Sequence, residues 1–193
     1  MQKMRYLPKG TYTSMPWKNG GGVTTEIIVH PANASMADFD WRISMADVAQ
    51  DGPFSIFDGI DRTLCILEGN GMSLSIDACE PVSLTMESDP LPFAADVSVY
   101  AVLGNGPIVD LNVMSRRKHY AHRVERHRGA LTVHSTVSTA TVIFAADPVS
   151  VSSGGRNVNL QRRDSLLLEP GTGFAIEGVE KDARFFVVSF DQV

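Results

Sequence analysis

The chain has 193 residues, 44% of them hydrophobic, which is enough to bury one large β core or two smaller ones. Its formal net charge of −5 argues against a protein that wraps nucleic acid, and no apolar run approaches the roughly 20 residues of a membrane-spanning helix. Two cysteines, Cys65 and Cys79, are too few for a disulfide framework, and both are expected to be small core side chains. We therefore expect a cytoplasmic protein without a nucleic-acid or membrane partner.

Apolar and polar residues alternate with a period of two through the first half of the chain, a pattern typical of β-strands. Strands are predicted at residues 23–30, 40–48, 62–67, 72–76, 82–86, 97–103 and 108–114. After the third of these, Gly69 and Gly71 permit the positive φ angles of a tight reversal, which predicts a hairpin. Short helices fit only near residues 32–38 and 53–57.

The second half repeats this organisation. Strands are predicted at residues 130–134, 140–145, 158–160, 165–168, 173–176 and 184–190. The segments 91–96 and 168–171 resemble each other, and each precedes two apolar strands. We therefore predict a duplicated all-β protein with a larger half, residues 1–115, and a smaller half, residues 116–193. Many short strands joined by Gly, Pro and Asp turns are typical of sandwiches, jelly rolls and closed barrels.

A basic stretch lies where the two halves should meet. Its six permanent cations are Arg116, Arg117, Lys118, Arg123, Arg126 and Arg128, and its histidines are His119, His122 and His127. A basic stretch of this kind can bind nucleic acid, but the chain is acidic overall and Tyr120 is the only aromatic residue in the stretch. We interpret the stretch as a solvated connector with exposed histidines and salt bridges to acidic loops.

The most specific string in the chain runs from Met15 to Ile27 and contains three consecutive glycines. A phosphate loop requires Gly-Lys-Ser/Thr at the start of a helix, whereas here Lys18 precedes the glycines and a strand follows them. From residue types alone, the string predicts a glycine bulge that turns the chain into a barrel, with Trp17 as a buried plug.

Polar side chains are predicted on the inward faces of several strands. Asp110 and Asn112 share one face of their strand, and Arg42 and Arg62 lie on others with small or apolar neighbours. Because a small barrel has one interior, these groups should converge on one cavity. Arginine with Asp and Asn suits a carboxylate ligand, but the same residues could form structural ion pairs that tie strands together.

Several blocks in order resemble the HutD/Ves family. They are Pro16-Trp17-Lys18-Asn19-Gly20-Gly21-Gly22, Thr24-Thr25-Glu26-Ile27, Phe39-Asp40-Trp41-Arg42-Ile43-Ser44, Gly52-Pro53-Phe54-Ser55-Ile56-Phe57, Gly59-Ile60-Asp61-Arg62, Leu67-Glu68-Gly69 and Asp110-Leu111-Asn112-Val113-Met114-Ser115-Arg116. They cover most of residues 15–116, whereas the second half is similar in length and strand character. The intact Lys-Asn-Gly-Gly-Gly run is closer to the HutD branch, which is associated with bacterial histidine utilisation.

The resemblance implies a cupin-type jelly-roll barrel in two halves (a bicupin) and a small-molecule-binding accessory or regulatory protein. We expect the ligand to be a small carboxylate such as urocanate or formylglutamate, whose binding limits or regulates histidine catabolism. The assigned ligand-binding residues are Lys18, Asn19, Glu26, Arg42, Arg62, Asp110 and Asn112. The arginines would anchor the carboxylate, Lys18 and the two asparagines would orient it, and Glu26 and Asp110 would hold the cations in place.

Two other functional classes remain open from the sequence. One is a metal-independent enzyme, an isomerase or hydrolase acting on an acid of the same pathway, with its catalytic residues unassigned. The other is a structural or interaction protein whose polar interior consists of ion pairs. Exposed edge strands of a bicupin would also allow a homodimer.

Metal binding is not expected. Many cupins bind a metal through a His-x-His pair, a glutamate and a later histidine. Residues 57–63, where that pair should lie, contain no histidine, and the counterpart of the later histidine is Asn112. His119 and His122 have ligand-like spacing, but their basic neighbours disfavour a bound cation. We therefore expect neither a metal nor another cofactor.

Overall fold

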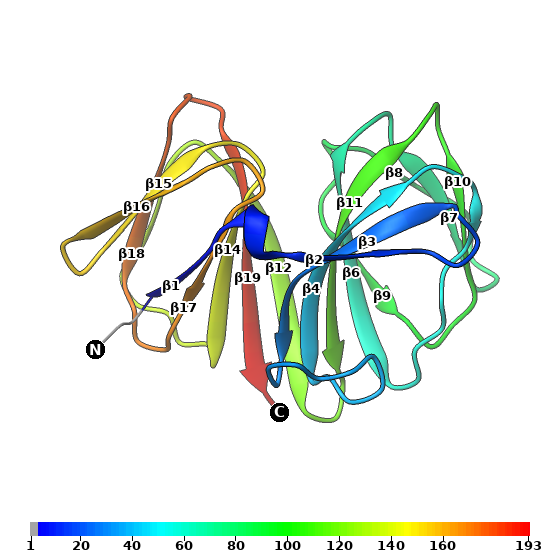
Figure 1. The fold of residues 1–193 in the computed structure, drawn as a ribbon, viewed down its shortest axis with the longest axis horizontal. Coiled ribbons are helices and arrows are strands. Elements are labelled where there is room, and N and C mark those ends of the chain that lie inside the picture. Colours follow the sequence, from blue (N-terminus) through cyan, green and yellow to red (C-terminus); the bar gives the residue numbers. More distant parts are fainter. Residues whose placement is uncertain (1–3) are drawn as a thin grey trace. The chain divides into compact units, whose positions relative to one another are not determined.

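The computed structural model describes residues 4–193, whose regular secondary structure is almost entirely β-strand (Figure 1). The helical content of these residues is one short 3-10 turn, η1 (Lys9–Thr11). The short helices expected near residues 32–38 and 53–57 are not formed: residues 32–38 are turns and irregular chain, Pro53 ends a short strand, and residues 54–57 are irregular. Within residues 4–193 there is no helix with the length and hydropathy that a transmembrane segment requires.

The chain divides into two compact units, which we call the first and second barrels. The first barrel comprises Tyr12–Ala121, and the second comprises His122–Gln192 together with the N-terminal segment that ends at Thr11. The expected division into residues 1–115 and 116–193 differs from this one in two ways. The boundary between the barrels lies after Ala121, and the N-terminal segment belongs to the second barrel. The N-terminal strand belongs to the second barrel because its backbone pairs in antiparallel fashion with a strand of that unit at Ser165–Leu168.

The first barrel consists of two sheets. The larger has the order β2-β3-β4-β11-β6-β9, with β2 (Thr13–Pro16), β3 (Gly22–His30), β4 (Trp41–Val48), β6 (Ile60–Glu68), β9 (Leu91–Ala94) and β11 (Ile108–Arg116). The smaller has the order β5-β10-β7-β8, with β5 (Gly52–Pro53), β7 (Met72–Ile76), β8 (Val82–Leu84) and β10 (Val99–Leu103). Apolar side chains of both sheets form its main core cluster, which includes Leu64, Leu74 and Ala101.

The second barrel also consists of two sheets. One has the order β1-β17-β14-β19-β12, with β1 (Met4–Leu7), β12 (Tyr120–Arg128), β14 (Ala140–Ala145), β17 (Ser165–Leu168) and β19 (Arg184–Gln192). The other has the order β13-β18-β15-β16, with β13 (Leu131–Val133), β15 (Val149–Ser153), β16 (Arg156–Leu160) and β18 (Phe174–Gly178).

Six consecutive strands in each barrel pair in the same way. Strand β6 pairs with β9 and β11, as β14 pairs with β17 and β19. Strand β7 pairs with β8 and β10, as β15 pairs with β16 and β18. The internal repeat expected from the segments 91–96 and 168–171 is therefore present, because these segments contain or directly follow the equivalent strands β9 and β17.

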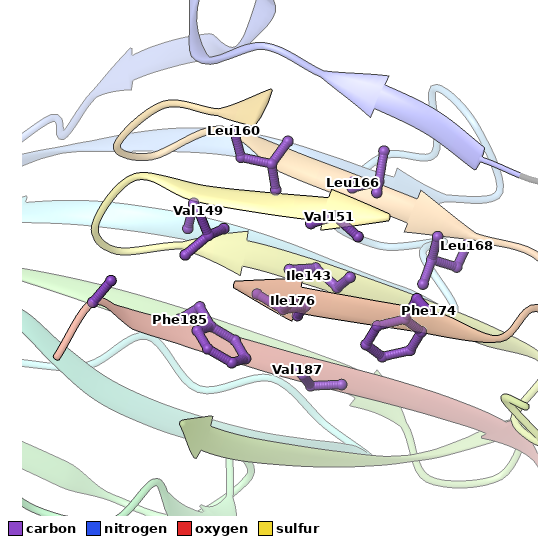
Figure 2. Close-up of a cluster of buried hydrophobic side chains, with 12 residues drawn as sticks. Ile143, Val149, Val151, Leu160, Leu166, Leu168, Phe174, Ile176, Phe185 and Val187 are labelled. Carbon is purple, nitrogen blue, oxygen red and sulfur yellow. The ribbon is translucent and has the colours of Figure 1, made fainter. Parts of the chain in front are cut away.

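The interior of the second barrel is filled by apolar side chains. Figure 2 shows them pointing into the space between β14, β15, β16, β17, β18 and β19. Phe185 at the start of β19 and Ile143 on β14 are fully buried among them. Asp164, which is 2% exposed, is a buried charged residue of this barrel outside the apolar cluster.

Two local expectations are wrong. Gly69 and Gly71 do have positive φ angles of 92° and 83°, but the turn leads from β6 in one sheet to β7 in the other rather than into a paired hairpin. The basic stretch is not a connector, because most of it forms β12 beside β19. The rings of His122 and His127 accordingly lie 6.2 and 5.4 Å from those of Phe190 and Phe185, so these histidines are not exposed linker residues.

Other expectations are met in part. Arg117 forms salt bridges of 2.8 and 3.1 Å with Asp61 and Asp96, which raise the pKa of the guanidinium and lower the pKa of Asp96. Cys65 is buried as expected, but Cys79 is exposed in the turn after β7.

Candidate functional site

The first barrel contains a cavity of about 730 Å³ that is partly open to solvent. Strands β3, β4, β6, β10 and β11 line it, together with the loop between β2 and β3 and residues 50–57. Six of the seven predicted ligand-binding residues line this cavity: Lys18, Asn19, Arg42, Arg62, Asp110 and Asn112. The seventh, Glu26, does not line it but contacts Arg42.

Strand pairing explains why these side chains meet. Residues opposite each other on β4, β11 and β6 form three rows across the sheet: Arg42, Met114 and Arg62; Ser44, Asn112 and Leu64; Ala46, Asp110 and Ile66. Because alternate residues of a strand share a face, all three rows face the same side. A β-bulge between Val109 and Asp110 adjusts the pairing next to this last carboxylate. The inward faces predicted for the three strands are thus confirmed.

Arg42 is a buried cation with a partly buried counter-ion. Its side chain is 3% exposed, and its Nε donates a hydrogen bond of 2.7 Å to Glu26 Oε2 on β3. Its Nη1 lies 3.3 Å from Ser44 Oγ, whereas its Nη2 has no hydrogen-bond partner among residues 4–193. One guanidinium nitrogen is therefore buried and available to a ligand.

Arg62 lies within an aromatic cage formed by Phe54, Phe57 and Phe93. Its guanidinium carbon is 5.2, 5.4 and 5.9 Å from the three ring centroids, within the range of cation–π attraction. Its Nη2 donates to the carbonyl oxygen of Ser55 at 3.4 Å, and its Nε has no partner in the described part of the chain. Burial lowers the pKa of Arg62 to about 10, so the side chain is still charged at neutral pH.

Asp110 is 1% exposed, and burial raises its pKa to about 7. The positive charge of Arg62 and a hydrogen bond from the backbone of Ala46 oppose that rise without cancelling it. Its Oδ1 and the Oδ1 of Asn112 are buried and have no hydrogen-bond partner in the described residues. The carboxyl of Asp110 therefore changes protonation near neutral pH.

The glycine-rich string forms the turn between the paired strands β2 and β3. Trp17 is half-buried rather than a buried plug, and its indole Nε1 donates to Thr24 Oγ1 at 2.7 Å. A Cβ at Gly22 would lie 2.5 Å from the carbonyl oxygen of Asp47 and 3.1 Å from the Trp17 ring. Glycine is required here because the β4 backbone and the indole approach it closely.

The aromatic cage was not predicted. Phe54 and Phe57 belong to the block at residues 52–57 that carried the family resemblance, but no role was given to them. Sequence reasoning could not place them over Arg62, because they lie in an irregular segment without strand periodicity. The sequence signal for the cage is that Arg62 shares a strand face with the apolar residues Ile60 and Leu64. A buried arginine among apolar residues needs partners that compensate for its lost hydration.

No group of three or more His, Cys, Asp and Glu side chains within residues 4–193 is arranged to hold a metal ion.

The comparison with family models decides the identity of the chain. The model named HutD matches residues 9–186. This chain belongs to the HutD family. An uncharacterised 21.2 kDa protein of the hutC 3′ region from Pseudomonas putida is 33% identical over 189 residues, which cover 97% of each chain.

Solved structures agree with this assignment. A conserved protein of unknown function from Pseudomonas aeruginosa PAO1 is 31% identical, with a TM-score of 0.89 over 98% of this chain and 100% of that one. HutD from Pseudomonas fluorescens SBW25 is 27% identical, with a TM-score of 0.84 over 98% and 99% of the two chains. A cupin barrel protein from Leptotrichia buccalis, 11% identical over 91% of each chain with a TM-score of 0.57, shows the fold alone. The HutD family chain is thus a cupin-type jelly-roll protein, as expected.

In the second barrel of this HutD family protein, the equivalent positions of β14 and β19 carry no charged residue and no asparagine. Its ladder carries Thr141, Val187 and Phe185 at the positions that correspond to Arg62, Asn112 and Asp110. Asp110 and Phe185 lie equally far in sequence from the end of the preceding strand. The same topology therefore encloses polar groups and a cavity in the first barrel and an apolar core in the second.

Proposed function

We propose that this HutD family protein binds a small carboxylate in the first-barrel cavity and thereby limits or regulates histidine breakdown. One observation carries the proposal: the cavity contains two buried guanidinium groups, each with a nitrogen that has no partner in the described chain. A buried charged donor without a partner is unfavourable, and a carboxylate supplies both the hydrogen bonds and the opposite charge.

The arrangement of the arginines suits a single anion. Arg42 and Arg62 flank Met114 in one row of the sheet, so both side chains extend from the same level of the barrel. Glu26 neutralises Arg42 only, and Asp110 titrates near neutral pH. The net positive charge that remains near Arg62 favours an acidic ligand over a neutral or cationic one.

The link to histidine breakdown is proposed from the family and from the name of a relative. The chain belongs to the HutD family, and its relative from Pseudomonas putida is named for the hutC 3′ region. Urocanate and formylglutamate are acids of histidine breakdown and are our candidates for the ligand. The fraction of protein with ligand bound would then rise with the concentration of the intermediate, and the bound form would limit histidine breakdown.

Calorimetric titration tests binding directly. Formate, acetate, urocanate and formylglutamate are each titrated into wild type, Arg62→Ala and Arg117→Ala. We expect at least one acid to bind, and Arg62→Ala to weaken it about 10- to 100-fold because a charge-assisted hydrogen bond is lost. Arg117→Ala is the matched control, since this arginine forms exposed ion pairs outside the cavity. Negligible heats for wild type with all four acids would contradict the proposal.

The regulatory part of the proposal is tested in cells. A strain lacking this chain is complemented with wild type or Arg62→Ala, and intracellular urocanate is measured during growth on histidine. We expect Arg62→Ala to behave like the deletion. If Arg62→Ala no longer binds acid but complements the deletion fully, regulation does not depend on ligand binding in the cavity, and this part of the proposal is wrong.

Asp110 favours one alternative, a metal-independent isomerase or hydrolase acting on the same class of acid. A buried carboxyl with a pKa of about 7 is suited to proton transfer at neutral pH. Turnover of a candidate acid by wild type that is lost in Asp110→Asn, and weakened in Glu26→Gln through Arg42, would support catalysis. Binding without turnover in wild type would exclude it for that acid.

A further inference from the structure

The unpaired buried atoms of the cavity are of two chemical kinds. Arg42 Nη2 and Arg62 Nε are donors, whereas Asn112 Oδ1 and, in the ionised form of the carboxyl, Asp110 Oδ1 are acceptors. A carboxylate can only accept hydrogen bonds, so it satisfies the arginines and leaves the two oxygens without a donor. Buried polar groups are nearly always hydrogen-bonded in folded proteins, so the two oxygens indicate a second recognition element.

Donors and acceptors are separated along the strands. The arginines belong to the row of Met114, Asn112 lies one row further along β11, and Asp110 lies one row beyond that. Each row is two residues, or roughly 7 Å, from the next along the strand. A single small anion at the arginines therefore does not also occupy the Asn112–Asp110 part of the cavity.

We propose that the ligand is an acid that also carries an N–H group, with its carboxylate at the arginines and its N–H donating to Asn112 and Asp110. This inference rests on the proposed function, because it assigns the arginine end to a carboxylate. It adds a requirement that the carboxylate alone does not impose, namely a hydrogen-bond donor displaced along β11.

The remaining surfaces fit the spacer between the two ends. Met114, Trp17 and Phe54 line the same cavity and supply apolar contact area. At about 730 Å³, the cavity accommodates an acid that carries a ring or an amide. A short acid such as formate or acetate reaches one end only.

The charges around Asp110 determine whether protons are released or taken up when the ligand binds. Arg62 on β6 attracts its carboxylate and Asp47 on β4 repels it, while Arg42 on β4 lies in the row of Arg62. An N–H donor that bonds to the carboxylate favours its charged form and so releases a proton on binding at pH 7. A second carboxylate at this place would instead cause proton uptake.

A matched pair of acids tests the donor requirement. 3-(Pyrrol-2-yl)propanoate and 3-(furan-2-yl)propanoate have the same shape, but only the pyrrole carries an N–H, and neither ring titrates near pH 7. We expect wild type to bind the pyrrole acid at least about 10-fold more tightly than the furan acid, because the furan leaves a buried acceptor without a donor. Asn112→Val should lose most of this preference, because it removes an acceptor that only the pyrrole N–H can satisfy.

Buffers of different ionisation enthalpy give the second readout. Calorimetry at pH 7 should show proton release with the pyrrole acid, less with the furan acid and none with Asp110→Asn. Equal affinities of wild type for the two acids would overturn the donor requirement and leave the carboxylate site intact. If wild type binds neither of these acids and also gives no binding heat with formate or urocanate, the proposed function itself is wrong.

Discussion

Asp110 is an ionisable residue that is almost completely buried. Its inward orientation and its raised pKa have separate causes. The residue faces the barrel because the pleat of β11 sets every second side chain on that side. Its position beside Ala46 and Ile66 removes it from water, which raises its pKa from 3.8 to about 7. Arg62 supplies the opposing attraction, so the carboxyl remains able to ionise in the physiological range.

The pKa of Asp110 predicts a pH-dependent stability. The folded state retains a proton between about pH 4 and 7 that the unfolded state has released, so the free energy of unfolding falls as pH rises through this window. Each pKa unit is worth about 1.4 kcal/mol, which makes the loss a few kcal/mol at most. Asp110→Asn should remove this dependence. Urea unfolding of both proteins at pH 5 and pH 8 measures it, and parallel changes in the two proteins would contradict it.

At the scale of elements, the cavity depends on how the β2–β3 turn meets β4. Gly22 allows the Asp47 carbonyl and the Trp17 ring to come close, and Trp17 in turn lines the cavity. Asn19 Oδ1 accepts a hydrogen bond of 3.0 Å from the Gly21 backbone N–H, which fixes the turn locally. Gly22 is thus a packing requirement between two strands and a loop, whereas Gly20 has space around it and a positive φ of 72°.

Gly22→Ala should destabilise the first barrel by about 1–3 kcal/mol, because the new methyl group must displace β4 backbone or the indole. Gly52→Ala is the control, since a Cβ there meets nothing within 4 Å and neither glycine has a positive φ. Its effect should be within about 1 kcal/mol of zero. The intrinsic fluorescence of Trp17 and Trp41, both in the first barrel, follows the unfolding. Equal midpoints for the two variants would show that Gly22 is not tightly packed.

At the scale of the whole molecule, one strand topology occurs twice with two different interiors. Six consecutive strands pair identically in the two barrels. The first barrel places arginine, asparagine and aspartate on its inward rows, and the second places threonine, valine and phenylalanine there. The apolar cluster of the second barrel supplies packing without ligand chemistry.

Reciprocal substitutions at equivalent ladder positions should have opposite effects. Val187→Asn introduces an amide without partners into a packed apolar core and should cost about 1–3 kcal/mol. Asn112→Val removes an unsatisfied oxygen beside a cavity and should leave stability unchanged or higher. Urea unfolding followed by circular dichroism compares them. A comparable loss in both variants would mean that the two interiors are packed alike.

Much of the fold follows from local patterns. Period-two alternation located most strands, and the resemblance of segments 91–96 and 168–171 revealed the repeat. Strand β12 was missed because its sequence, from Tyr120 to Arg128, is dominated by charge. Its long cationic side chains can extend to solvent while the backbone pairs with β19, so composition outweighed a pairing that only the folded chain reveals.

The sequence by itself determined which side chains share a face of each strand, because strand parity depends on local geometry alone. Arg42, Arg62, Asp110 and Asn112 were assigned to the interior in this way, and the cavity contains all four. Only the tertiary structure decided which of their atoms are already satisfied: Glu26 pairs with Arg42, three phenylalanines surround Arg62, and Asp110 keeps an unpaired oxygen. Those contacts join strands and loops far apart in the chain, and their burial sets the charge of each group.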